Sequence, residues 1–226
     1  MVMLNIYRFR YARLQLEHSA AQRTGRNARK ALDEMPQNLN ESYARIPSRL
    51  NPESFNRQLL QKALVWPCFS TRPMNILMLA DAIVLEDGDT DIDDDTRLHS
   101  PDVIVELAQG MITFDKDRNL VSLSHASIKE FLTLKGILYG YVRDFAISES
   151  EAQREIWRRC LQYLNLPAFQ ARSRQSLWEL HKTDQYPLYT YAAHDWARHI
   201  QCPTGEEWSA IEPFLPTRKA EKGGNF

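Results

Sequence analysis

The sequence predicts a mainly α-helical fold with one small two-stranded β-hairpin. Most apolar residues recur at helical spacing, whereas the short runs Met111 to Phe114 and Leu120 to Ser124 have the composition and length of strands. The polar stretch Asp115 to Asn119 between these runs is typical of a hairpin loop. The hydrophobic period then changes from strand to helix within Leu120 to Leu134, so a helix should follow the second strand directly.

Three predicted helices precede the hairpin. The first covers Leu59 to Trp66 and is ended by Pro67, and the second covers Asn75 to Ile83. The third has Ser100 as its N-cap and Pro101 at its first helical position, followed by an apolar stripe. Three helices followed by a two-stranded hairpin is the element order of a winged helix, which we expect to span residues 54–136.

Helical segments are predicted on both sides of this domain. Residues 1–53 form an N-terminal helical segment with an amphipathic helix over Leu4 to Leu16 and a short helix over Ala28 to Leu32. Asn40 is the expected N-cap of a third helix, and Pro47 should end or kink it.

The C-terminal helical region covers residues 137–215. Ser148 and Glu151 have the spacing of a capping box, which should open a helix that Asn165-Leu166-Pro167 closes. Leu177, Trp178 and Leu180 suggest a short helix, and apolar residues from Leu188 to Ile200 mark a longer one. Residues 216–226 lack apolar content and should be a disordered tail.

The most informative single residue is His125, which lies where the second strand gives way to the following helix. Ser127 and Glu130 have S-x-x-E spacing, which predicts a capping box at the start of this helix. His125 is therefore expected on a strand-to-helix elbow, beside the free amides of a helix N-terminus.

Composition limits the classes of partner and the cell compartment. The chain has 28 Lys and Arg against 29 Asp and Glu, so no global field draws it to nucleic acid or anionic lipid. Its three cysteines, Cys68, Cys160 and Cys202, are far apart and lack metal-ligand spacing, which favours reduced thiols. The N-terminus has no signal pattern, and the apolar runs are too short to span a bilayer. We expect a cytoplasmic protein without membrane contact.

No motif in the sequence predicts catalysis, a metal or a cofactor. In the acidic run from Asp87 to Asp95, a calcium loop would need Gly at its sixth position and Glu at its twelfth, which hold Ile92 and Leu98. His194 and His199 are five residues apart, which does not suit zinc on one helical face. Neither a G-x-S-x-G elbow nor a G-x-x-x-x-G-K-[ST] phosphate loop occurs.

A winged helix also raises the alternative of DNA binding. Its recognition helix would be the third one, from Pro101 to Gln109, which contains Asp102 and Glu106 but no Lys or Arg. Two carboxylates repel a phosphate backbone, whose neutralisation provides most of such affinity. A winged helix that packs on protein is the better interpretation.

Four blocks of sequence carry a family resemblance. They are YRFRYARLQLE (Tyr7 to Glu17), ARKALDEMPQNLNESYARI (Ala28 to Ile46), the run ending in HASIKEFL (His125 to Leu132) and YPLYTYAAHDWARH (Tyr186 to His199). In this order they resemble the region just after the NACHT ATPase of fungal NLR-like proteins, which are STAND-type signalling ATPases that often end in ankyrin repeats. A similar winged-helix module is catalogued with GPI inositol-deacylase-like proteins. The likeness covers Tyr7 to Gln201, and the unmatched first six residues suggest a truncated gene model or a degenerate copy.

The resemblance implies regulation and not catalysis. In related STAND ATPases the winged helix folds over bound ADP, and a histidine at the strand-to-helix elbow contacts the phosphates. His125, followed by Phe131-Leu132, looks like that histidine, although the Asp that often follows it is Ala126 here. The alternative role for His125 is a hydrogen bond to backbone at the elbow.

We therefore expect a non-enzymatic regulatory fragment without a cofactor. The implied partners are a NACHT-type ATPase domain or a second copy of the chain, with ADP or ATP bound only in the context of a full-length protein. Two alternatives remain open: a DNA-binding winged helix, and a non-catalytic part of a GPI inositol-deacylase-like protein.

Overall fold

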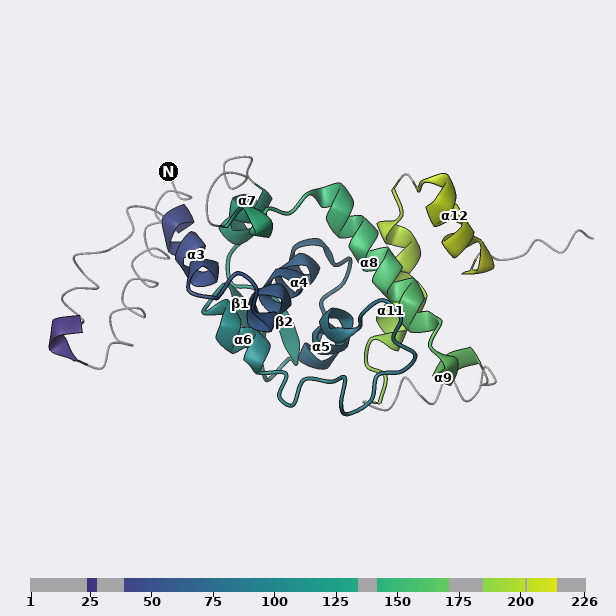
Figure 1. Cartoon of the computed structure of the whole chain (residues 1–226), viewed down its shortest axis with the longest axis horizontal. Helices are drawn as coiled ribbons and strands as arrows, with labels where there is room; N and C mark the ends of the chain where they lie inside the picture. The colour runs from purple at the N-terminus through teal and green to yellow at the C-terminus, as the bar shows by residue number, and fades with distance from the viewer. Residues whose placement is uncertain (1–23, 28–38, 134–141, 171–184, 202, 215–226) are drawn as a thin grey trace, which may run out of the picture.

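The structure, a computed structural model, describes residues 24–27, 39–133, 142–170, 185–201 and 203–214. This part of the chain is mainly helical and contains one antiparallel β-hairpin (Figure 1), which confirms the predicted fold class. The helices expected over 4–16, 28–32 and around Leu177, and the expected disordered tail, lie outside the described residues.

The elements follow one another in an order that the sequence largely predicts. From the N-terminal side they are α3 (Leu39–Ser48), α4 (Phe55–Phe69), α5 (Ile76–Val84), α6 (Val103–Ala108), β1 (Ile112–Asp115), β2 (Leu120–Leu123) and α7 (Ala126–Thr133). The C-terminal half contains η2 (Arg143–Phe145), α8 (Glu149–Leu164), α9 (Pro167–Gln170), α11 (Tyr189–Asp195), η3 (Trp196–His199), α12 (Gly205–Ile211) and η4 (Glu212–Phe214).

The winged helix has three extended segments, one more than the sequence predicts. β1 and β2 pair in antiparallel register from Ile112 opposite Leu123 to Asp115 opposite Leu120. Met74, between α4 and α5, forms a further antiparallel bridge to Val121, whose N–H donates to the Met74 carbonyl at 2.8 Å. Together with α4, α5 and α6, these segments give the helix–strand–helix–helix–strand–strand order of a winged helix.

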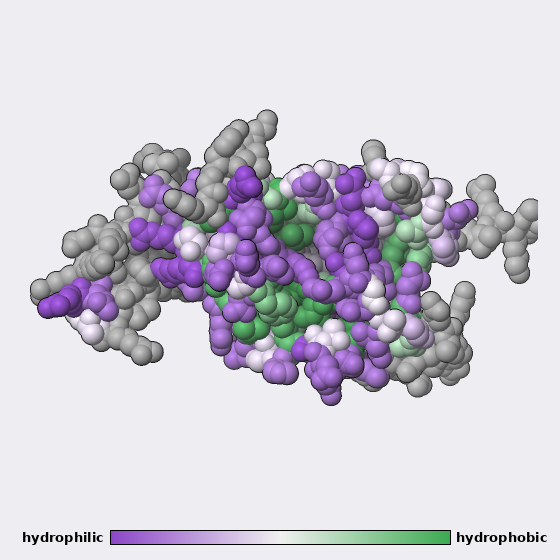
Figure 2. Space-filling view, in the orientation of Figure 1, coloured by the Kyte–Doolittle hydropathy of each residue, from purple (hydrophilic) through white to green (hydrophobic). Residues whose placement is uncertain are grey.

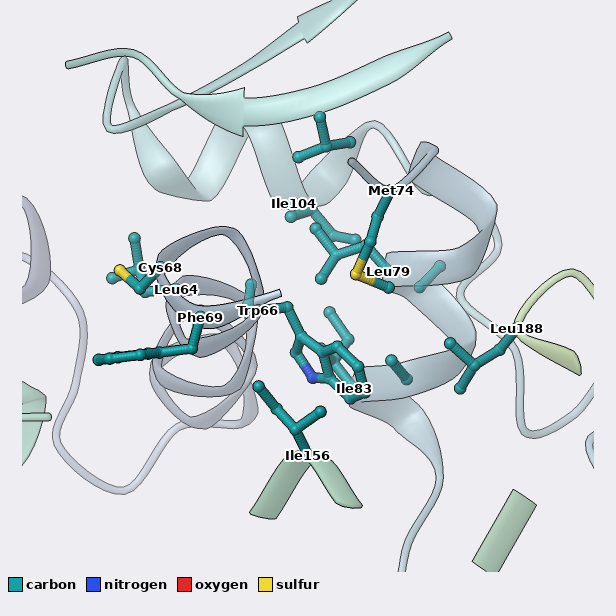
Figure 3. Close-up of a cluster of buried hydrophobic side chains, with 14 of the residues drawn as sticks. Leu64, Trp66, Cys68, Phe69, Met74, Leu79, Ile83, Ile104, Ile156 and Leu188 are labelled. Atoms are coloured by element: carbon teal, nitrogen blue, oxygen red, sulfur yellow. The ribbon is translucent and has the colours of Figure 1, made fainter. Parts of the chain in front are cut away.

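A single hydrophobic core joins the winged helix to the helices that follow it. Trp66 of α4, which is 2% exposed, points toward Ile83 of α5 and Ile156 of α8 (Figure 3). One face of α8 belongs to this core, because Ala152, Ile156, Trp157, Cys160 and Leu161 are all buried. In the view of Figure 2 the surface is largely hydrophilic, with hydrophobic residues gathered near its centre around the first helices of the domain.

Several predicted helix boundaries are wrong. Asn40 lies inside α3 and does not precede it. Pro67 does not end α4, which continues to Phe69, because the Ser70 N–H still reaches the Trp66 carbonyl at 2.8 Å and completes the last turn. The predicted end of α3 at Pro47 is confirmed within one residue, since the helix stops at Ser48.

The start of α6 also differs from the prediction. The N–H of Val103 donates to the Ser100 carbonyl and that of Ile104 to the Pro101 carbonyl, so residues 100–102 form a turn. The helix begins at Val103 with Asp102 in the cap position and no side-chain cap bond. The fixed φ angle of proline suits both the first turn of a helix and a β-turn, so Pro101 could not show which of the two structures forms.

The helix caps of the C-terminal half agree with the sequence only in part. Ser148 occupies the N-cap of α8, as predicted, but its hydroxyl bonds that of Ser150 at 2.9 Å and forms no capping box. Thr204 and Glu207 form a full capping box at the start of α12, which was not predicted from the sequence. The predicted helix from Leu188 to Ile200 is divided into α11 and the 3-10 helix η3.

Candidate functional site

The strand-to-helix elbow exists as the sequence predicts. β2 ends at Leu123 and α7 begins at Ala126, so two residues separate them. The first of these, Ser124, is fixed to the beginning of the hairpin, because its N–H donates to the Met111 carbonyl at 3.0 Å and its hydroxyl to the Gly110 carbonyl. The second, His125, therefore projects from a backbone position that the wing holds in place.

His125 itself caps helix α7. The backbone N–H of Ser127 donates to the imidazole Nδ1 of His125 at 3.1 Å, which is the bond that an N-cap side chain makes with the second helical residue. A backbone N–H can only donate, so Nδ1 acts as the acceptor and the neutral ring carries its proton on Nε2. The elbow thus presents the histidine as a donor through Nε2.

Ser127 serves a role other than the predicted cap. Because α7 begins at Ala126, Ser127 lies inside the first turn, 5% exposed. Its hydroxyl is 2.7 Å from His125 Nδ1 and 2.8 Å from the hydroxyl of Tyr43, a fully buried residue of α3. Glu130, the predicted partner in the capping box, lies on the exposed face of α7. Ser127 is therefore a link between α3 and the elbow.

Contacts to α4 and α3 hold helix α7 in place. Lys129 Nζ donates to the Cys68 carbonyl at 2.7 Å and lies 4.3 Å from the centroid of the Phe69 ring. On another side, the Phe131 ring packs against Tyr43 with centroids 5.5 Å apart. These contacts fix the orientation of the helix that His125 caps.

A second buried polar cluster joins the winged helix to the C-terminal helices. Asp195, at the end of α11 and 1% exposed, accepts from the Thr71 hydroxyl at 2.9 Å and pairs with Arg72 at 2.5 Å and Arg198 at 3.0 Å. The Tyr191 hydroxyl accepts from the Thr71 N–H at 3.1 Å. Asp195 Oδ2 has no hydrogen-bond partner but lies in the ion pair with Arg72, so both oxygens of this carboxylate contact groups of the protein.

The two histidines of the C-terminal region do not form a metal site. His199 is buried, with its ring nitrogens 2.8 Å from the Tyr191 hydroxyl and 2.5 Å from Gln153 Oε1. Burial lowers the pKa of His199 to about 4. His194 is exposed and bonds the Thr190 carbonyl. Within the described ranges, no three potential metal-ligating side chains gather.

The acidic loop uses its carboxylates to fix its own turns. Asp93 Oδ1 accepts from the N–H groups of Asp95 and Thr96 at 3.1 and 3.0 Å, and also from the Thr96 hydroxyl. Asp89 similarly accepts from the Glu86 N–H at 2.7 Å. These local bonds give Asp89 and Asp93 a structural role in the turns of this run.

The buried thiols also lack the properties of nucleophiles. Burial raises the pKa of the Cys68 thiol to about 12, and it raises the pKa of the Cys160 thiol as well. Both therefore stay protonated at neutral pH.

A cavity of about 410 Å³ lies between α4, η2 and the start of α8, with Trp66, Ala82 and Ile147 in its wall. No described histidine or cysteine lines it.

The third helix of the winged helix has an acidic exposed surface. Asp102 and Glu106 are both exposed, as is Gln109, whose side-chain oxygen accepts from Arg49 Nη1 at 2.9 Å. This surface would meet the phosphate backbone in the usual docking mode of the fold. It is poorly suited to that contact.

Comparison with known proteins identifies the domain type. Residues 50–148 match the family of the GPI inositol-deacylase winged helix domain. A winged helix domain of this type is therefore present, and it is not a catalytic domain. No solved structure matches the chain. None of the helices in the described residues is long and apolar enough to cross a bilayer.

A curated fungal protein is similar over most of the chain. Azaphilone pigments biosynthesis cluster protein L of Monascus ruber is 26% identical over 200 residues, which cover 85% of this chain and 41% of that protein. The chain thus spans about two fifths of the length of this curated relative.

Proposed function

We propose that this chain is a non-enzymatic regulatory and protein-interaction fragment of a NACHT (STAND) NLR-like signalling protein. In this proposal its winged helix packs on a nucleotide-binding core that the chain does not carry. The proposed setting is the cytoplasm, where free thiols such as Cys68 and Cys160 persist. The winged helix match over residues 50–148 and the ordered resemblance blocks support this assignment.

The observation that carries the proposal is the geometry of the elbow. His125 caps α7 through Nδ1, so the ring proton lies on Nε2, the nitrogen that would donate to an anionic oxygen in this proposal. The dipole of α7 favours negative charge at the same end of the helix, where the N–H groups of Ser127 and Ile128 already donate to His125. A phosphate group of a nucleotide held by a partner core is the ligand that this combination suits.

The test is association with a NACHT fragment from a related protein, measured with the purified chain in the presence and absence of ADP. We expect binding that ADP strengthens, and His125→Ala should weaken the ADP-dependent part about tenfold, since a charge-assisted hydrogen bond contributes roughly 1.5–3 kcal/mol. His99→Ala is the matched control, because His99 is an exposed histidine in the loop between α5 and α6. Absence of association under both conditions would count heavily against the proposal.

The family match supports a second hypothesis, in which the chain is a non-catalytic part of a GPI inositol-deacylase-like protein. This reading agrees with the protonated buried thiols, since it assigns no chemistry to the chain. It predicts association with the remainder of such an enzyme and none with a NACHT fragment. Hydrolysis of a simple ester by the chain alone would contradict both readings.

A further inference from the structure

A chain of hydrogen bonds connects helix α3 to the elbow. It runs from the Tyr43 hydroxyl to the Ser127 hydroxyl at 2.8 Å and from there to His125 Nδ1 at 2.7 Å. Tyr43 and Ser127 are 84 residues apart in sequence, so the chain crosses between two separate segments. The Tyr43 and Ser127 side chains are 0% and 5% exposed, which removes water as an alternative partner.

The direction of these bonds follows from the backbone. The N–H of Ser127 donates to Nδ1, so this nitrogen carries no proton and the Ser127 hydroxyl can only donate to it, and the two donors share its one lone pair. The oxygen of Ser127 is then free to accept, and the hydroxyl of Tyr43 is its donor. Each bond in this order supports the next, and a buried hydroxyl left without its partner would cost about 1–3 kcal/mol.

Helix α3 is held on the domain by two further contacts that lie away from the imidazole. The Tyr43 ring packs against Phe131, and the Pro47 carbonyl accepts from Arg57 Nη1 at 2.5 Å. Because the Tyr43 hydroxyl bonds that of Ser127, a displacement of α3 would break the first bond of the chain. The position of α3 and the orientation of the His125 ring are therefore linked through Ser127.

We infer that Tyr43 and Ser127 are positioning residues for His125, and that helix α3 regulates the elbow through them. With α3 docked, the ring is fixed with Nδ1 toward the helix and its proton on Nε2. With α3 displaced, the ring loses part of its support. The regulatory meaning of this link rests on the proposed function, whereas the link itself is a property of this chain alone.

Amide hydrogen exchange at residue 127 measures the link directly, because that N–H donates to the His125 ring. In the full chain, Tyr43→Phe keeps the aromatic packing and removes one hydroxyl, and we expect exchange at residue 127 to become about fivefold faster. Exchange of the Val121 N–H, which donates to the Met74 carbonyl, should stay unchanged. Tyr189→Phe is the matched control, since the Tyr189 ring packs on Phe169 away from the elbow.

A second variant separates the link from general loss of stability. Ser127→Ala retains the amide and should accelerate its exchange by a similar factor, and adding Tyr43→Phe to it should have no further effect at residue 127. Additive effects, equal acceleration at Val121, or no change at residue 127 in either variant would overturn the inference. A NACHT fragment that fails to bind would remove the proposed function and leave this result unaffected.

Discussion

The buried imidazole of His199 makes the stability of the protein depend on pH. Its pKa is lowered from 6.5 to about 4 in the folded state, because burial opposes its charge. As the pH falls below 6.5, His199 binds a proton in the unfolded chain but stays neutral in the folded chain. We therefore expect the free energy of unfolding to decrease between pH 6.5 and about 4, by about 3 kcal/mol in total.

Chemical denaturation at a series of pH values measures this effect. His199→Gln keeps a hydrogen-bonding side chain beside Tyr191 without a titrating group, so its curve should lack the decrease in this pH range. His99→Gln, at an exposed position, should follow the wild type. Equal slopes for the wild type and His199→Gln would show that His199 is charged in the folded protein.

The residues of the elbow show which site contacts are readable from sequence. The placement of His125 between a strand and a helix was predictable, because the change of hydrophobic period is a local signal. Tyr43 was not, because its bond to Ser127 joins segments 84 residues apart. The sequence pattern predicted Ser127 as the N-cap of α7, but the neighbouring His125 side chain can also accept a backbone N–H and occupies the cap in the structure.

Among the helices, α12 has the most complete cap and should depend on it. Thr204 accepts from the Glu207 N–H at 3.4 Å, and the Glu207 side chain accepts from the Thr204 N–H at 2.7 Å. Thr204→Ala removes the first of these bonds and should destabilise the helix by about 1 kcal/mol. Hydrogen exchange of the α12 amides should accelerate about fivefold, whereas Ser209→Ala, an exposed change on the same helix, should not accelerate it.

Element boundaries were harder to predict than the elements themselves. The T-x-x-E spacing at Thr204 was present in the sequence and could have revealed the start of α12. Pro67 gave a false end because a proline in the last turn of a helix removes one hydrogen bond without stopping the chain. The extended segment at Met74 had no local signal, since a single bridge to Val121 defines it.

For the molecule as a whole, the buried cluster around Asp195 joins the winged helix to the C-terminal helices, so we expect the two parts to unfold as one cooperative unit. Asp195→Ala removes the acceptor of the Thr71 hydroxyl and the partner of two arginines, whose side chains are 42% and 64% exposed and can reach water. We expect a loss of about 2 kcal/mol in the free energy of unfolding, less than for a fully buried pair. Asp94→Ala, in the exposed acidic loop, should have almost no effect.

Thermal unfolding observed by two probes tests the same point. Near-ultraviolet signals from tryptophan and far-ultraviolet signals from helices should change together in the wild type and in Asp195→Ala, with a lower midpoint in the variant. Two separate transitions in the wild type would show that the C-terminal helices unfold independently.

The overall charge pattern predicts which of two partners, DNA or protein, the winged helix binds. A formal net charge of −1 and the exposed Asp102 and Glu106 on the third helix oppose DNA, so we expect no salt-dependent mobility shift of a duplex. Replacing both residues by Lys should create weak binding that weakens further as salt rises. Replacing Asp94 and Asp95, which lie outside this helix, by Lys makes the same change in net charge and should create weaker binding to DNA. A wild-type shift that salt abolishes would contradict the assignment of the domain to protein contacts, because phosphate neutralisation would then have to come from a surface other than α6.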